Sequence, residues 1–86
     1  MPIEYSARFR SQYARLPLSL RIKLMKALRL LDSNFRHHGL RSHPVLGFEG
    51  IYEAYVDDKY RMTYERHGDI LVMRNIDNHD ECLRNP

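Results

Sequence analysis

The sequence predicts an α+β domain in which two N-terminal helices pack on a mostly antiparallel four-stranded sheet, in the order β-α-α-β-β-β. Three observations lead to this prediction. Apolar residues recur at helical spacing between residues 7 and 33, apolar and polar residues alternate in segments after residue 50, and turn signals separate those segments. With 86 residues there is room for one hydrophobic core, so a single domain is expected over 1–86.

The chain begins with a predicted strand and helix. Residues 2–6 alternate apolar and polar side chains, which is typical of a short strand. Ser6 then stands where a helix N-cap is favoured. Apolar residues follow at helical spacing, at Phe9, Tyr13 and Leu16, and predict a first helix over about residues 7–16.

A second helix is expected from Pro17, or just after it, to about Ser33, because proline breaks the preceding helix and favours the start of a new one. One face carries an apolar stripe: Leu20, Leu24, Ala27, Leu28 and Leu31. The far side carries a basic stripe: Lys23, Lys26 and Arg29. Between them lies an apolar shoulder of Leu18, Ile22 and Met25, which we expect to pack on the first helix or on a partner protein.

Residues 34–50 are predicted to form a long loop, which in a small domain is usually functional or mobile. Three strands are expected after it, at residues 51–56, 60–66 and 70–76. Asp57-Asp58 and His67-Gly68-Asp69 are the turn signals between them.

Strand alternation assigns side chains to faces of the sheet. The apolar set of each strand should meet the helices, which leaves Glu53, Tyr55 and Arg61 on the uncovered face. A tight turn at residues 57–59 would place these three side by side, and His79, just after the last strand, can reach the same region.

A carboxylate, a phenol, a guanidinium and an imidazole together suit general acid–base chemistry on a phosphodiester, because imidazole titrates near neutral pH and guanidinium stabilises developing phosphate charge. The alternative is a Glu53–Arg61 cross-strand salt bridge on a solvated sheet, with His79 capping a turn. The alternation of side chains along the strands, taken by itself, favours the salt bridge.

Charge is unevenly distributed along the chain. Residues 1–50 carry nine Lys or Arg against three Asp or Glu, whereas residues 51–86 carry five against eight. The basic half suits an RNA-binding surface, but charge alone favours an ordinary solvated helix face next to an acidic sheet. No apolar run approaches a membrane span, and the N-terminus lacks an uninterrupted apolar segment of the signal-peptide type, so a cytoplasmic protein without membrane contact is expected.

The histidines of the sequence do not form a metal-binding pattern. His37, His38 and His43 lie in one predicted loop, and His67, His79 and Cys82 lie further on. Their spacing fits no zinc template, so we expect no metal and no cofactor. Surface positions are the simplest expectation for the loop histidines, and Cys82 is expected to be a small buried residue.

Four segments carry a resemblance to a known family: Leu40-Arg41, Gly50-Ile51-Tyr52-Glu53, Tyr60-Arg61-Met62-Thr63-Tyr64 and Asn78-His79-Asp80-Glu81. Together with length and element order, they resemble the RelE/ParE superfamily of type II toxin–antitoxin toxins over essentially the whole chain. That superfamily contains ribosome-dependent mRNA endonucleases of the RelE, YoeB and YafQ types, and gyrase poisons of the ParE type.

The resemblance implies roles for individual residues. Arg61 falls where RelE-type and YoeB-type toxins have a catalytic arginine, His79 falls where YafQ-type and YoeB-type toxins have a catalytic histidine, and Glu53 matches a strand glutamate of other members. The chain departs from RelE itself, since Glu53 and Tyr55 stand at the positions of two strand lysines and Leu83 replaces a terminal tyrosine. It therefore resembles the histidine-containing types more closely.

The function implied is a metal-independent endoribonuclease that leaves 2′,3′-cyclic phosphate or 3′-phosphate ends and inhibits translation. Arg61, His79 and Glu53 would be catalytic, and Arg41, Lys59, Arg74 and Tyr55 would contact RNA. The implied partners are mRNA, the ribosome and an antitoxin on the shoulder of Leu18, Ile22 and Met25. The alternatives are a ParE-like gyrase-binding toxin and an inactive toxin fold that only binds its antitoxin.

Overall fold

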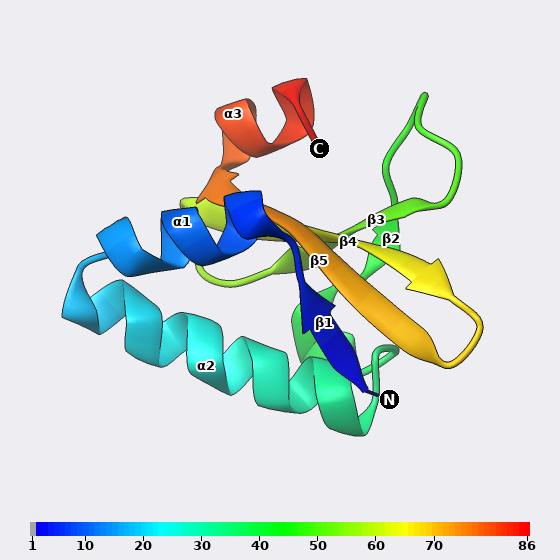
Figure 1. Ribbon diagram of the computed structural model, residues 1–86, viewed down its shortest axis with the longest axis horizontal. Helices are drawn as coiled ribbons and strands as arrows, with labels where there is room; N and C mark the ends of the chain where they lie inside the picture. Colours follow the sequence, from blue (N-terminus) through cyan, green and yellow to red (C-terminus); the bar gives the residue numbers. More distant parts are fainter. Residues whose placement is uncertain (1) are drawn as a thin grey trace.

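The computed structural model describes residues 2–86, and its elements follow the predicted order with additions after residue 33 (Figure 1). The elements are β1 (Ile3–Tyr5), α1 (Ala7–Arg15), α2 (Leu18–Ser33), the 3-10 helix η1 (His38–Leu40), β2 (His43–Pro44), β3 (Ile51–Tyr55), β4 (Tyr60–His67), β5 (Ile70–Asn78) and α3 (His79–Arg84). None of the helices in the described part of the chain is long and apolar enough to cross a bilayer.

The strands of residues 2–86 form one five-stranded sheet in the order β1-β5-β4-β3-β2. β1 runs parallel to β5, and every other neighbouring pair is antiparallel. The α+β class and the order of the predicted elements are confirmed, but the sheet has one strand more than the four predicted. β2 lies in the segment expected to be a loop, and it pairs His43 with Glu53 and Pro44 with Tyr52. Two residues are too few to show alternation, and Pro44 suits an edge strand because it has no N–H to donate.

The predicted helix boundaries are confirmed to within a residue. The Ser6 hydroxyl accepts a hydrogen bond from the Phe9 N–H at 3.1 Å and caps α1. α1 ends at Arg15, and α2 begins at Leu18, directly after Pro17. The chain therefore turns where proline excludes helical angles for the residue before it.

One face of the sheet packs on α1 and α2 and forms the hydrophobic core. The buried residues of this core include Phe9, Leu20, Leu24, Ala27 and Leu31 from the helices and Met62, Tyr64, Leu71, Met73 and Ile76 from the strands. The shoulder lies outside it, since Leu18, Ile22 and Met25 are 71%, 62% and 44% exposed. It is thus an apolar surface that α1 does not cover.

The other face is not open, as alternation had suggested, because α3 and the residues after it fold back over β4 and β5 (Figure 1). The Thr63 hydroxyl donates to the Pro86 carbonyl at 2.8 Å, and the Cys82 thiol donates to the Arg61 carbonyl at 3.4 Å. Thr63 and Asn75 are consequently fully buried. α3 has only six residues, too few for a helical period to be recognised in the sequence.

Gln12 completes the edge of the sheet beyond the short strand β1. β1 pairs with β5 only as far as Met73. Further along β5, Gln12 Oε1 accepts from the Ile76 N–H at 3.0 Å, and Gln12 Nε2 donates to Asn75 Oδ1 at 2.6 Å. Asn75 in turn donates to the Asn85 carbonyl at 3.0 Å. One side chain of α1 therefore links the sheet edge to the segment after α3.

Replacing Gln12 by alanine should lower the free energy of unfolding by about 1–3 kcal/mol, because the Ile76 N–H and the buried Asn75 amide each lose a partner. Urea denaturation followed by circular dichroism would measure the change. Ser11→Ala, at an exposed position of the same helix, is the matched control and should have a neutral or slightly stabilising effect. Equal stability of the two variants would contradict this role for Gln12.

Cys82 reports whether α3 stays docked. Burial, reinforced by the negative charges of Glu53 and Asp77, raises the pKa of the Cys82 thiol to about 12. At pH 8 only about one thiol in ten thousand is then ionised, so alkylation by iodoacetamide should be slow in the native protein and fast in urea. Rapid alkylation of the native protein would show that α3 does not protect the thiol.

Candidate active site

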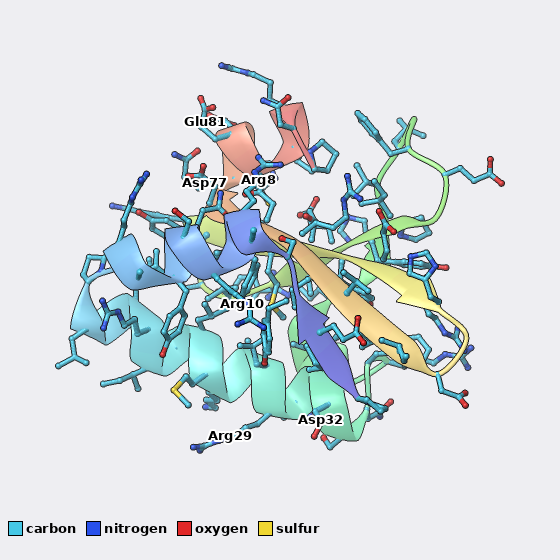
Figure 2. All side chains as sticks on the ribbon, viewed as in Figure 1. Arg8, Arg10, Arg29, Asp32, Asp77 and Glu81 are labelled. Atoms are coloured by element: carbon cyan, nitrogen blue, oxygen red, sulfur yellow. The ribbon has the colours of Figure 1, made fainter. Side chains whose placement is uncertain are left out.

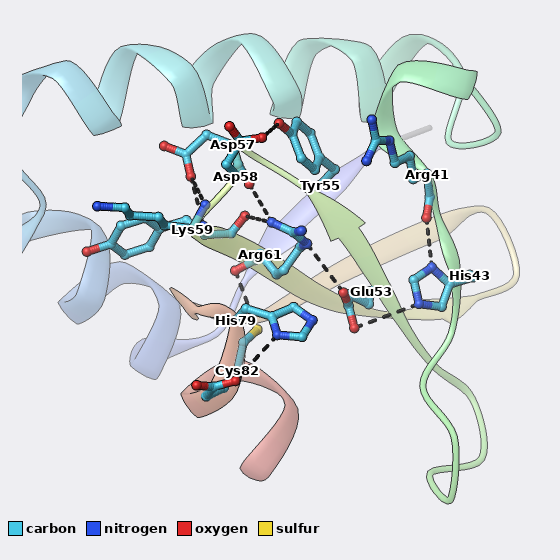
Figure 3. A network of polar contacts seen from close by, with 12 residues as sticks. Arg41, His43, Glu53, Tyr55, Asp57, Asp58, Lys59, Arg61, His79 and Cys82 are labelled. Atoms are coloured by element: carbon cyan, nitrogen blue, oxygen red, sulfur yellow. Dashed lines mark hydrogen bonds and ion pairs between the residues drawn. The ribbon is translucent and has the colours of Figure 1, made fainter.

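The candidate site is built on β3 and β4, where the register places Tyr55 opposite Arg61. Alternation brings Glu53, two residues before Tyr55, onto the same face. Arg61 Nε lies 3.5 Å from Glu53 Oε1, and the Arg61 guanidinium carbon lies 4.8 Å from the centre of the Tyr55 ring (Figure 3). The sequence prediction that these three side chains adjoin is confirmed.

Glu53 is not solvent-exposed, contrary to the prediction, since only 4% of the residue is accessible. Arg61 approaches one of its carboxylate oxygens, and His43 Nε2 lies 3.8 Å from the other. Alternation predicts only which side of the sheet a residue faces, and the covering by β2 and α3 could not be read from it. A buried carboxylate of this kind requires charged or hydrogen-bonding partners.

Arg61 is held by several groups at once. Its Nη1 donates to the carbonyl oxygens of Asp57 and Tyr60, the latter at 2.9 Å, while its Nε faces Glu53. Within residues 2–86, no hydrogen bond uses Nη2. The guanidinium is thus fixed on one side and keeps donors for a phosphate on the other.

His43 belongs to the candidate site, although only a surface position was expected for it. Its Nδ1 lies 2.8 Å from the Arg41 carbonyl, and because a carbonyl can only accept, Nδ1 must carry the proton. Nε2 therefore faces Glu53 and is the nitrogen that can take up a further proton. The pairing of β2 with β3 places His43 opposite Glu53. A strand of two residues is too short to be recognised in the sequence.

His79 is the first residue of α3 and lies beside Arg61 in Figure 3. Its backbone N–H donates to the Lys59 carbonyl at 2.8 Å, which fixes the start of α3 against the turn before β4. Its half-exposed ring has Nδ1 3.5 Å from Asp80 Oδ1. No hydrogen bond or ion pair within the described residues joins His79 to Glu53 or Arg61.

The four residues predicted to contact RNA lie in three places. Arg41 and Tyr55 join the cluster, with the Arg41 guanidinium carbon 4.7 Å from the centre of the Tyr55 ring. Lys59 lies in the neighbouring turn between β3 and β4. Arg74 instead pairs with Glu65 and donates to the Pro86 carbonyl at 3.2 Å.

Asp57 organises that turn. It accepts the N–H groups of Lys59 and Tyr60 at 2.9 and 2.8 Å and lies 3.3 Å from the Lys23 ammonium of α2. Burial acts to raise the pKa of Asp57, but these backbone and lysine donors together outweigh it, so the pKa lies below its usual value. The carboxylate therefore stays ionised and keeps the turn next to Arg61 in shape.

The arrangement offers groups for proton transfer and for phosphate binding. In the part of the chain that the structure describes, no group of three or more His, Cys, Asp or Glu side chains could hold a metal ion. What the site holds is a fixed guanidinium, a second guanidinium at Arg41 and two imidazoles.

The sequence matches no protein-family model and no curated protein. Solved structures do match. YafQ from E. coli strain BL21(DE3) has a TM-score of 0.73 and 22% identity, with 92% of this chain and 93% of that one covered. A YoeB/ParE toxin from Agrobacterium tumefaciens has a TM-score of 0.77 and 15% identity, with 92% and 99% covered.

A third match is the RelB–RelE antitoxin–toxin complex from Methanococcus jannaschii, with a TM-score of 0.75, 16% identity, and 91% and 92% covered. At these identities the likeness is one of backbone fold. It extends over nearly the full length of both chains in each comparison. The chain therefore has the fold of the YafQ, YoeB/ParE and RelE toxins, as the four sequence segments predicted.

Proposed function

We propose that this protein is the toxin of a type II toxin–antitoxin system and acts as an endoribonuclease on mRNA at the ribosome, in the cytoplasm. One observation carries the proposal: Arg61 is fixed by the buried Glu53 while its Nη2 side stays available, and His43 and His79 flank it. A structural salt bridge alone would not require imidazoles on both sides of the pair.

The proposed reaction is attack of a ribose 2′-hydroxyl on the adjacent phosphorus. The O2′–P bond forms as the P–O5′ bond breaks, which gives a 2′,3′-cyclic phosphate and a free 5′-hydroxyl. One imidazole takes the 2′-hydroxyl proton, and another protonates the leaving 5′-oxygen. Arg61 stabilises the charge that develops on the phosphoryl oxygens.

Glu53 serves best as the group that orients Arg61, because its carboxylate is buried between Arg61 and His43 and lies away from solvent. Proton transfer then rests with His43 and His79, both of which are half-exposed and can reach substrate. The sequence implied acid–base work for Glu53 or an orienting role, and the burial supports the second.

We further propose that an antitoxin docks on the exposed shoulder of Leu18, Ile22 and Met25. Beside it lies a hollow of about 440 Å³ between β1, α1 and α2, lined by apolar side chains that include Tyr5, Phe9 and Met25. Arg10 extends between the two helices at this hollow (Figure 2). An apolar segment flanked by acidic residues would fit both the hollow and its charge.

Arg61→Ala and His79→Ala should each abolish the growth arrest caused by expression of the chain, because general acid–base groups and phosphate ligands typically contribute about 10²–10⁴-fold to rate. His67→Ala, which removes a histidine at the distant β4–β5 turn, should leave the arrest intact. Circular dichroism would verify that all three variants fold.

Primer extension on mRNA from the expressing cells would locate the breaks, which are expected within codons. Arrest that persists in both Arg61→Ala and His79→Ala would overturn the assignment of these residues. DNA-damage signalling without RNA breaks would point to a gyrase poison, and absence of any arrest would point to a fold that only binds its antitoxin.

The docking surface predicts a separate effect. Ile22→Asp should weaken the complex with the product of an adjacent small reading frame at least about tenfold, since a 62%-exposed isoleucine would be replaced by a charge that the interface must desolvate. Isothermal titration calorimetry would measure the affinity. Ser11→Asp adds the same charge at an exposed position of α1 that does not line the hollow, and it should change the affinity little. Equal losses in both variants would place the interface elsewhere.

A further inference from the structure

Tyr55 is shared by two arginines of the site. The guanidinium carbons of Arg41 and Arg61 lie 4.7 and 4.8 Å from the centre of the same ring. Figure 3 shows the two arginines on different sides of it. A ring occupied in this way has no free face on which an RNA base could stack, so its role differs from that of an aromatic stacking platform.

The Tyr55 ring is itself held in place. Its hydroxyl donates to Asp58 Oδ1 at 2.7 Å, in the turn that follows β3. This hydrogen bond, before the smaller effects of burial and of the Asp58 charge, raises the pKa of Tyr55, so the phenol stays protonated and keeps its donor. At its other end the ring is fixed by the β3–β4 register, which sets Tyr55 opposite Arg61.

Arg41 reaches the ring from an unusual backbone conformation. It ends η1 with φ of 51°, in the left-handed region that residues with a Cβ seldom adopt. Its N–H donates to the His38 carbonyl at 3.2 Å, and its carbonyl accepts from His43. Within residues 2–86 no carboxylate pairs with Arg41, so its charge is not neutralised by an ion pair.

Two like charges on one ring repel each other, and the ring quadrupole offsets part of that repulsion. An anion between the two guanidinium groups, or beside them, would offset the remaining repulsion most strongly. Phosphate suits this position because guanidinium forms paired hydrogen bonds with it. Because the ring and both backbones are already fixed, such an anion would find the two cations preorganised.

We propose that Tyr55 is a positioning residue whose ring, set by the β3–β4 register, holds Arg41 and Arg61 as a two-point clamp for the phosphates of a single RNA strand. This inference rests on the proposed function, since it uses Arg61 as the ligand of the reacting phosphate. It couples Arg41, already expected to contact RNA, to Arg61, and it replaces the expected RNA contact of Tyr55 by a support that touches no substrate atom.

The test is binding of a single-stranded RNA oligonucleotide whose 2′-hydroxyls are all methylated, which cannot be cleaved. Fluorescence anisotropy at several salt concentrations gives the affinity and its salt dependence for the full chain. Arg41→Ala should weaken binding and reduce the slope of log K against log salt by about 0.7, the value for one phosphate contact on a single strand.

Tyr55→Leu should weaken binding about three- to thirtyfold through loss of the support for both cations. The combined Arg41→Ala, Tyr55→Leu variant should lose less than the product of the two single losses, because both changes disable one clamp. Tyr55→Phe keeps the ring in the β3–β4 register and loses only the hydrogen bond to Asp58, so it should bind within about threefold of the unaltered protein. A direct contact of the phenol with RNA would not allow this.

Multiplicative losses in the combined variant, tight binding by Tyr55→Leu, or absence of salt-dependent binding by the unaltered protein would overturn the clamp. Urea midpoints of all variants separate these outcomes from unfolding. Because the probe cannot be cleaved, a failure of the RNase proposal would leave this measurement unaffected. The converse result is RNA cleavage that depends on His79 together with binding losses of Arg41→Ala and Tyr55→Leu that simply multiply. That result would overturn the clamp and leave the proposed function standing.

Discussion

The buried carboxylate of Glu53 is the constraint on which this part of the molecule depends. With 4% of the residue exposed, it needs polar or charged partners, and these come from two different strands, His43 on β2 and Arg61 on β4. Removing one partner of such a pair typically costs about 3–5 kcal/mol because a charge is left buried. The same contacts therefore fix the register of three strands and the position of the guanidinium proposed to bind phosphate.

The parts of the fold that could be predicted are those controlled by interactions within a few residues. Ser6 and Pro17 delimit α1 and α2 because capping and proline sterics act within a few residues. The proximity of Glu53, Tyr55 and Arg61 was also predictable, since alternation along two strands and a tight turn between them are enough to fix it.

What the sequence did not reveal comes from contacts between distant segments. β2 and α3 are too short to show a period, so neither His43 beside Glu53 nor the cover over Thr63 was foreseen. The register shift between Thr63 and Tyr64 likewise leaves Arg74 of β5 without a partner residue on β4, and its side chain pairs with Glu65. Alternation predicts the face of a side chain, but not what lies over that face.

The uneven charge of the sequence acquires a physical meaning at the site. Arg41 comes from the basic half of the chain, whereas the acidic half supplies Glu53, Asp57 and Asp58. Each of these carboxylates is used internally: Glu53 holds Arg61, Asp57 holds the turn and Lys23, and Asp58 holds the Tyr55 hydroxyl. Acidic groups that are paired within the protein repel an RNA strand less than their number suggests. The cations that they support remain available. Net charge along the sequence is therefore a poor guide to where this protein would bind RNA, and the pairing of each charge is a better one.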